Sequence, residues 1–321
     1  MGPKTEKQAI DSVKLENGEI SYEYETILRK WKDDFSNLLL NEISDLFLEN
    51  TRKLLEDWED QMENMNIDTD NNSTQNQTVD QSDILLNTEI SIEELNSALK
   101  SAKANKATGI DNLPNEILKC ERIKELILKL FQKCFESGTL PSMWNLSIIH
   151  PILKKGKDYR DPLSYRSISL MSTVAKIFNS LICERLTEFL DSNELLCEEQ
   201  NGFRKLRSCV DHIYNLYTVL REQKNNNLPT FLCYVDFAKA FDSVNHDLLF
   251  AKLLSIGVMG KIYKVIKSMY EKLKCCVKID DKATDWFSVE RGVRQGDNLA
   301  PLLFAIFIND LAIDIKNLMN N

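Results

Sequence analysis

The sequence predicts an α+β protein, and three observations support that fold class. Several stretches carry apolar residues at three- and four-residue spacing, which is the pattern of amphipathic helices. Shorter runs rich in β-branched and aromatic residues, such as 147–153 and 231–235, are bounded by turn residues and predict strands. A polar stretch at 62–87 separates an N-terminal helical extension from the remainder, so we expect the extension and a linker to precede the main body.

Composition indicates a globular, intracellular protein. Of the 321 residues, 43% are hydrophobic, and no apolar run approaches the roughly 18 residues that a membrane span needs. The first ten residues, MGPKTEKQAI, are charged and lack the apolar core of a signal peptide. We therefore expect no membrane association and a location in the nucleus or cytoplasm. The 8 cysteines and 3 histidines are scattered without zinc or disulfide spacing.

The net charge of −9 hides an asymmetry along the chain. Residues 1–100 carry 9 Lys and Arg against 23 Asp and Glu, whereas residues 101–321 carry 31 against 26. The C-terminal two thirds are therefore slightly basic, and the overall acidity does not argue against a nucleic-acid partner for them.

The first 100 residues predict helix, linker and helix again. Residues 19–60 have a helical apolar pattern and suit either a docking arm or a helix packed on its own domain. The linker is rich in Asn, Gln, Asp and Thr and is expected to be disordered, because it has too few apolar residues to offset the ordering entropy. Ser91 and Glu94 form the S-x-x-E pattern of a capping box and predict a helix start.

The next segment alternates helix with extended structure. The stretch KANKATGIDNLP breaks the helix that begins at Ser91, and a further helix starts at Pro114. Residues 122–136 are helical and end at Gly138. Two extended runs follow, at 147–153 and 162–170.

Basic residues mark these two extended runs. Lys154 and Lys155 occupy the turn between them, and Arg166 lies within the second run. This combination suits a polyanion such as a triphosphate, but it is also common in a solvated hairpin.

Two helices follow, at 173–190 and 209–223, and a polar loop with Phe203 and Arg204 lies between them. This loop either stacks a base and holds phosphates or is ordinary surface.

The run 231–235 is expected to be a strand that delivers Asp236 to its end. A carboxylate there either meets a cation or partner, or starts the following turn. Beyond it the pattern predicts two helices, a hairpin, a loop containing Gln295 between two glycines, and an apolar helix, at 246–254, 260–273, 275–289, 291–301 and 302–315.

Five of these segments resemble, in order and spacing, the reverse transcriptase domain of non-LTR (LINE-type) retrotransposons over roughly residues 88–321. The segments are ATGIDNLPNEILK, IIHPILKKGK with YRSISL, QNGFRKLRS, VDFAKAFDSV and RGVRQGDNLAPLLF. The resemblance implies a right-hand polymerase that copies an RNA template from a DNA primer with dNTPs. It divides the chain into a helical connector at 1–61, a disordered linker at 62–87, fingers at 88–227 and a partial palm at 228–321.

The resemblance also implies roles for individual residues. Asp236 matches the first catalytic carboxylate, which binds two Mg²⁺ ions together with the backbone carbonyl of Phe237. Phe241 matches the aromatic residue that excludes a 2′-hydroxyl. The triphosphate contacts match Lys154, Lys155 and Arg166; the loop under the nascent base pair matches Gln295 and Gly296; and the template-side loop matches Phe203 and Arg204.

The chain departs from the family pattern at several places. The Tyr/Phe-Ala-Asp-Asp hairpin that supplies the second carboxylate pair is not in this sequence, so we expect an incomplete two-ion site and no DNA polymerisation by the chain as given. Asp297 stands where the family has Cys and is expected to face phosphates unfavourably. A non-catalytic RNA-binding remnant and an acidic helical interaction protein are the alternatives, and the oligomeric state stays open.

Overall fold

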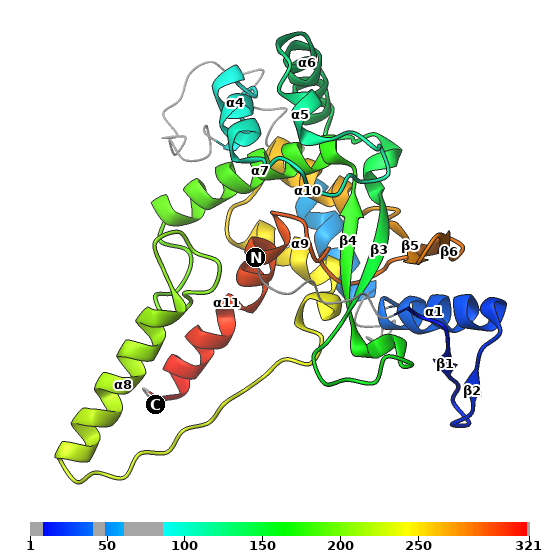
Figure 1. The fold of residues 1–321 in the computed structure, drawn as a ribbon. Helices are drawn as coiled ribbons and strands as arrows, with labels where there is room; N and C mark the ends of the chain where they lie inside the picture. The colour runs from blue at the N-terminus through cyan, green and yellow to red at the C-terminus, as the bar shows by residue number, and fades with distance from the viewer. Residues whose placement is uncertain (1–8, 41–48, 61–85, 320–321) are drawn as a thin grey trace, which may run out of the picture.

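The computed structural model describes residues 9–40, 49–60 and 86–319 and confirms a mixed helix and strand architecture (Figure 1). The predicted linker at 62–87 lies almost wholly outside the described residues. The strands are β1 (Val13–Lys14), β2 (Ile20–Ser21), β3 (Leu146–Leu153), β4 (Tyr165–Met171), β5 (Lys274–Ile279), β6 (Lys282–Ala283) and β7 (Phe287–Ser288).

The main sheet has the order β4-β3-β5-β6, with β7 also paired to β5. Strands β3 and β4 form an antiparallel hairpin in which Leu153 lies opposite Tyr165, whereas β3 and β5 run parallel over 146–149 and 274–277. The predicted hairpin at 275–289 is confirmed by the antiparallel pairing of β5 with β7, and β6 forms at its tip. The sheet therefore joins two regions that are more than 100 residues apart in sequence.

Helix boundaries follow the local signals. Ser91 forms the predicted capping box with Glu94, and Gly138 ends its helix in the left-handed conformation at φ 67°. Within the described residues, no helix combines the length and apolarity that crossing a membrane requires. The helices are α1 (Tyr24–Leu38), α4 (Ile92–Ser101), α5 (Asn115–Leu118), α6 (Glu121–Ser137), α7 (Thr173–Ser192), α8 (Cys209–Asn225), α9 (His246–Ser255), α10 (Gly260–Tyr270) and α11 (Ala300–Met319), with 3₁₀ turns η1 (Ser142–Asn145), η2 (Pro162–Ser164) and η3 (Ala240–Ser243).

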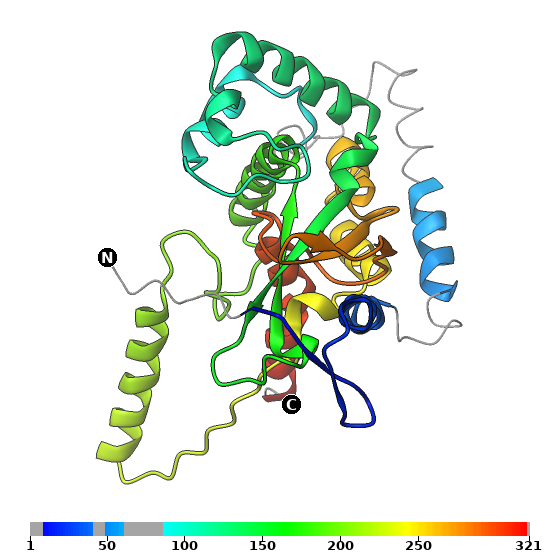
Figure 2. The ribbon, with the colours of Figure 1, turned by 45° about the vertical axis from the view of Figure 1, so that its right-hand side comes forward.

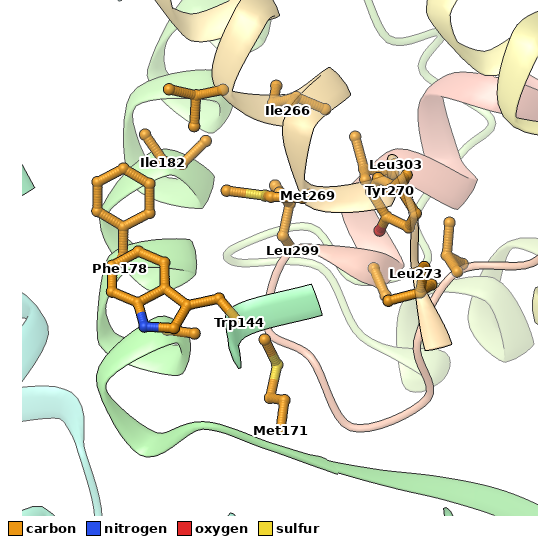
Figure 3. Close-up of a cluster of buried hydrophobic side chains, with 14 of the residues drawn as sticks. Trp144, Met171, Phe178, Ile182, Ile266, Met269, Tyr270, Leu273, Leu299 and Leu303 are labelled. Atoms are coloured by element: carbon orange, nitrogen blue, oxygen red, sulfur yellow. The ribbon is translucent and has the colours of Figure 1, made fainter. Parts of the chain in front are cut away.

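The hydrophobic core lies around α7, between α10, the start of α11 and the ends of the strands (Figure 3). Trp144 and Phe178 lie with their ring centroids 5.4 Å apart, and Phe131 makes edge contacts with both. Met269 and Leu299 close the cluster from α10 and from the segment before α11 (Figure 3). One continuous core therefore binds the sheet to the helices on both sides of it.

The N-terminal segment packs on this body. Trp31 of α1 is fully buried and meets the ring of Tyr165 edge-on, with centroids 4.8 Å apart. The prediction of helix over 19–60 is correct for α1 and for 49–60, and its part at 41–48 lies outside the described residues. Ile20 lies in β2 and not in a helix. Gly18, at φ 87°, allows the tight turn that brings Ile20 into β2 ahead of α1.

The predicted strand over 231–235 is wrong. No ladder joins this stretch to a described strand, and Phe231 and Tyr234 are 93% and 80% exposed. Its composition favours an extended backbone, but a strand also needs a partner edge. On the side of β4 away from β3, the Ser169 amide donates to the Gln295 carbonyl at 2.7 Å, so the Gln295 loop lies at that position and residues 231–235 do not.

Helix α8 precedes this stretch and contains no buried residue in the structure. Its exposed apolar side chains include Ile213, Tyr214 and Tyr217. Figures 1 and 2 show α8 and the segment that follows it standing away from the rest of the molecule. These residues are therefore attached to the body through the chain and not through a packed face.

Candidate active site

The candidate site centres on contacts among Gln295, Asp242 and Ser167. The side-chain amide nitrogen of Gln295 donates to both carboxylate oxygens of Asp242, at 3.2 and 3.3 Å. The Ser167 hydroxyl donates to Oδ1 of the same carboxylate at 3.0 Å. Three segments separated by at least 50 residues therefore meet at one carboxylate.

Strand alternation explains the position of Ser167. Successive side chains of β4 point to opposite faces, so Ser167 and Ser169 are buried while Arg166 is exposed on the other face. The Ser169 backbone also anchors the Gln295 carbonyl. The edge of β4 therefore holds both the backbone of the Gln295 loop and, through Asp242, its side chain.

The loop that carries Gln295 lies directly on the turn that carries Asp242. Gly292 donates its amide to the Val244 carbonyl at 2.7 Å, and Val293 donates to the Phe241 carbonyl at 2.8 Å. A Cβ at Gly292 would lie 3.1 Å from the Asp242 backbone, and Gly292 has φ 93°. Glycine is required here both for the close approach and for the left-handed conformation.

Opposing effects act on the pKa of the Asp242 carboxyl. Burial raises the pKa of its carboxyl above the ordinary value, whereas the hydrogen bonds from Ser167 and Gln295 and the charges of Lys154 and Lys239 lower it. Burial outweighs the donors, so the pKa is raised. Lys154, predicted from sequence as a triphosphate contact, thus lies close enough to act on this carboxylate.

Phe241 and Phe203, which the sequence placed in different roles, lie side by side. Their ring centroids are 6.1 Å apart, and Phe241 is also 5.1 Å from Phe304 of α11. A cavity of about 390 Å³ opens beside them. It is lined by residues 199–203, by His212 and by residues of α11 from Phe304 to Ile315. The aromatic side chains thus form one wall next to the Asp242 turn.

Other predicted residues lie apart from this centre. Asp236 and Phe237 belong to the exposed stretch before η3, and Lys155 is exposed in the turn after β3. Arg204 turns into its own loop, where it donates to the carbonyls of Cys197 and Gln200 and lies 3.6 Å from Asp191.

Gly296, in contrast, lies at the centre, because it adjoins Gln295. It has φ 108°, and a Cβ there would lie 3.2 Å from the Ser169 carbonyl.

The expectation that Asp297 faces phosphates is wrong. The residue is 3% exposed, and its carboxylate lies 3.4 Å from the Arg294 guanidinium and accepts from the Asn179 amide at 2.7 Å. The Leu299 backbone amide donates to its other oxygen at 3.2 Å. Asp297 therefore holds the base of the loop to α7 from inside the core.

Sequence reasoning missed a lysine-lined cavity at the start of α7. The cavity has a volume of about 440 Å³ and is lined by Lys103, Lys106 and Lys176 together with polar and apolar side chains, with no acidic residue among the lining. None of these three lysines has an ion-pair partner within the described part of the chain. The K-x-x-K spacing before Gly109 was the available signal.

The wall of this cavity is the loop with the ATGID segment. Asp111 accepts from the Ser172 hydroxyl at 2.7 Å and from the Val174 amide at 3.2 Å, so it caps α7 together with Ser172. Gly109 lies flat against the Met171 carbonyl, where a side chain has no room. These two residues hold Lys103 and Lys106 opposite Lys176.

The described residues do not by themselves fit a two-magnesium site. Among them, no three His, Cys, Asp or Glu side chains gather closely enough to hold a metal ion. The Asp242 carboxylate is engaged by Gln295 and Ser167 and so has both oxygens occupied by hydrogen-bond donors.

Comparison with known proteins identifies the family. Residues 152–320 match the family model "Reverse transcriptase (RNA-dependent DNA polymerase)". The chain is 30% identical over 224 residues to a probable RNA-directed DNA polymerase from transposon BS of Drosophila melanogaster, which covers 69% of this chain and 25% of that protein. It is 27% identical to the RNA-directed DNA polymerase from the mobile element jockey of the same species, over 69% of this chain and 24% of that protein.

The chain also matches a transposon protein of a second organism. The chain is 29% identical to the transposon TX1 uncharacterized 149 kDa protein of Xenopus laevis, over 70% of this chain and 17% of that protein. The chain spans about a quarter or less of the length of these relatives. The family match covers more than half of the chain and agrees with the resemblance seen in the sequence motifs. The chain therefore belongs to the reverse transcriptase family, in its non-LTR, LINE-type branch.

Proposed function

We propose that this chain provides the primer–template and nucleotide platform of an RNA-directed DNA polymerase, with fingers over 88–227 and palm from 228 onward. The observation that carries the proposal is the fixed placement of the Gln295 loop on the edge of β4, beside Asp242 and within reach of the Lys154 charge. The absence of a side chain at Gly296 lets a base pair approach the backbone of this loop, and the Lys154 charge suits a triphosphate.

The roles follow the positions of the side chains. Gln295 and Gly296 lie under the nascent base pair, and Phe241, held between Phe203 and Phe304, limits the space at the sugar. Lys154 acts on the triphosphate. Lys155, Arg166 and Arg204 keep their proposed contacts to triphosphate and template, although Arg166 lies on the opposite face of β4 from Ser167 and Arg204 is engaged within its loop.

Magnesium is the cofactor that reverse transcriptases generally use, as a Lewis acid for phosphoryl transfer. Asp236 and the Phe237 carbonyl are the donors that we propose for it in this chain. Asp236 is exposed, and among the described residues no group of three His, Cys, Asp or Glu side chains includes it. The remaining ligands of the ion therefore have to be supplied by groups that do not lie beside Asp236 in this structure.

Binding of a labelled DNA primer annealed to an RNA template tests this proposal. We expect the wild-type chain to bind the hybrid, with an affinity that rises when the complementary dNTP is added and not when a non-complementary dNTP is added. Fluorescence anisotropy measures both. Equal binding with every dNTP, or no binding of the hybrid, would contradict the proposal. We expect no primer extension by the chain as given, and Mg²⁺-dependent extension that Asp236→Ala abolishes would contradict that expectation.

The lysine-lined cavity gives a prediction for single-stranded RNA. Replacing Lys103, Lys106 and Lys176 together by alanine is expected to weaken RNA binding about tenfold or more at low salt. The slope of log K against log salt should become shallower by about 2, because each phosphate contact on a single strand contributes about 0.7. Anisotropy titrations at several salt concentrations provide the measurement.

A control triple variant separates local from general charge effects. Lys129, Lys133 and Lys278 are exposed and lie outside the cavity, and their replacement removes the same net charge. The control should change the slope by much less. Equal effects of the two triple variants would show that the cavity has no special role in RNA binding.

A further inference from the structure

We propose that Asp242 is a positioning residue that fixes the orientation of the Gln295 side-chain amide, so that the amide oxygen and not the nitrogen faces the bound nucleotide. The inference rests on the proposed function, because it assigns a task within the same site. Asp242 lies in the VDFAKAFDSV segment but received no role from the sequence, and the proposal depends on contacts that only the folded chain reveals.

The chemistry of a carboxylate sets the orientation. An ionised carboxylate only accepts hydrogen bonds, so each group that touches it has to be a donor. The Ser167 hydroxyl and the Gln295 amide nitrogen meet this requirement at 3.0 to 3.3 Å. A rotated amide would bring the Gln295 oxygen against the carboxylate oxygens, and acceptor would face acceptor.

Backbone hydrogen bonds fix the position of Gln295 relative to β4 and to the Asp242 turn. Its carbonyl accepts from the Ser169 amide at 2.7 Å, which ties the residue to the edge of β4. Two further backbone hydrogen bonds, from Gly292 to Val244 and from Val293 to Phe241, fix the distance between the loop and the Asp242 turn. With both backbones held, the contacts of the Gln295 amide nitrogen with the Asp242 carboxylate restrain the side-chain torsions and orient the terminal amide.

The consequence is a defined hydrogen-bond pattern for the ligand. With its nitrogen engaged by Asp242, Gln295 offers an acceptor to the nucleotide. A bound nucleotide group that donates a hydrogen bond gains from this arrangement, and a group that only accepts does not. Asp242 therefore contributes to nucleotide selection without touching the nucleotide itself.

Asp242→Asn tests this directly, because it keeps the size of the side chain and replaces one acceptor by a donor. The introduced amide group competes with the Gln295 nitrogen, so Gln295 loses its fixed orientation. We expect the gain in hybrid affinity produced by the complementary dNTP to fall about tenfold, as for the loss of one charge-assisted hydrogen bond. Binding of the hybrid without dNTP should change by less than about twofold, because its larger contacts lie elsewhere.

A double-mutant cycle distinguishes positioning from a general structural role. If Asp242 acts through Gln295, then Asp242→Asn has no further effect on dNTP dependence in the Gln295→Ala background. Asp285→Asn, at an exposed carboxylate outside the site, is the matched control and should leave both affinities unchanged. A penalty of the same size in both backgrounds would overturn the proposal, as would wild-type dNTP dependence in Asp242→Asn.

A measurement on the wild-type chain covers the case in which Asp242→Asn does not fold. Selective ¹⁵N labelling of glutamine, with the Gln295 signal identified by its loss in Gln295→Ala, reports hydrogen exchange of the side-chain amide. We expect exchange at least about tenfold slower than in free glutamine, and exchange at the free rate would overturn the proposal. A wild-type chain without any dNTP dependence would instead contradict the proposed function, so the two failures are distinguishable.

Discussion

Replacing Arg185 by alanine is expected to lower the free energy of unfolding by about 3–5 kcal/mol, the range for breaking a buried ion pair from one side. The Arg185 side chain is 4% exposed and pairs with Glu94, with one guanidinium nitrogen 2.8 Å from Oε2. It also donates to the carbonyls of Leu86, Thr88 and Glu89, and it stacks 4.9 Å from the Phe135 ring centre. The substitution leaves all these acceptors without their donor and removes the ion pair that joins α4 to α7.

Urea unfolding followed by circular dichroism measures the effect, with an unchanged m value as the sign that only stability changed. Arg160→Ala is the control, because Arg160 pairs with Asp158 at the surface, and it should lower the free energy of unfolding far less than Arg185→Ala does. Equal costs for Arg185→Ala and Arg160→Ala would contradict the central role of Arg185.

The same ion pair makes the free energy of unfolding depend on pH. Burial acts to raise the pKa of the Glu94 carboxyl, but hydrogen bonds from Arg185 and Ser91 outweigh it, and the pKa lies below the ordinary value of 4.5. A lowered folded pKa stabilises the protein above the unfolded pKa, and the contribution is lost as the pH falls through the folded value. The difference between wild type and Arg185→Ala should therefore shrink below about pH 4.

Gly109→Ala is expected to destabilise the chain by about 2–4 kcal/mol, from overpacking together with a weakened helix cap. The new Cβ would overlap the Met171 carbonyl, and the backbone amide of Ser172 lies close behind it. The loop therefore has to shift, and the shift weakens the hydrogen bonds by which Asp111 caps α7. Lys103 and Lys106 move with the loop, so RNA binding at the lysine-lined cavity should weaken as well.

Gly202→Ala is the matched control, because no atom lies within 4 Å of a Cβ built there. It should change the midpoint of thermal unfolding by no more than about 1 °C, whereas Gly109→Ala should lower it by several degrees. An unchanged midpoint for Gly109→Ala would show that the loop moves away from β4 without cost.

Local signals were sufficient to predict the helices. Ser91 with Glu94, Pro114 and Gly138 each specify a helix end through atoms within a few residues, and the structure has helix boundaries at all three. The hairpin of β5 and β7 was likewise visible, because its strands are close in sequence. The family motifs located the Gln295 loop and Phe241 for the same reason, since each motif is a continuous segment.

Contacts between distant segments were not predictable from these signals. The run 231–235 has the composition of a strand, yet nothing in its own residues specifies a partner, and it stays exposed. Asp297 has the charge of a surface residue, and its burial depends on Arg294 and Asn179 being placed around it by the fold. Asp242 was overlooked because its partners lie 75 and 53 residues away.

The isolation of α8 gives the chain two folding equilibria. A 17-residue helix without a packed face is only marginally stable in water, and its apolar side chains gain nothing from the core. Its backbone amides should therefore exchange hydrogen through local opening, at a free energy far below that of global unfolding. Changes in helix content during heating then report α8 first and the body later, so the melting temperature of the body is the midpoint of the later transition.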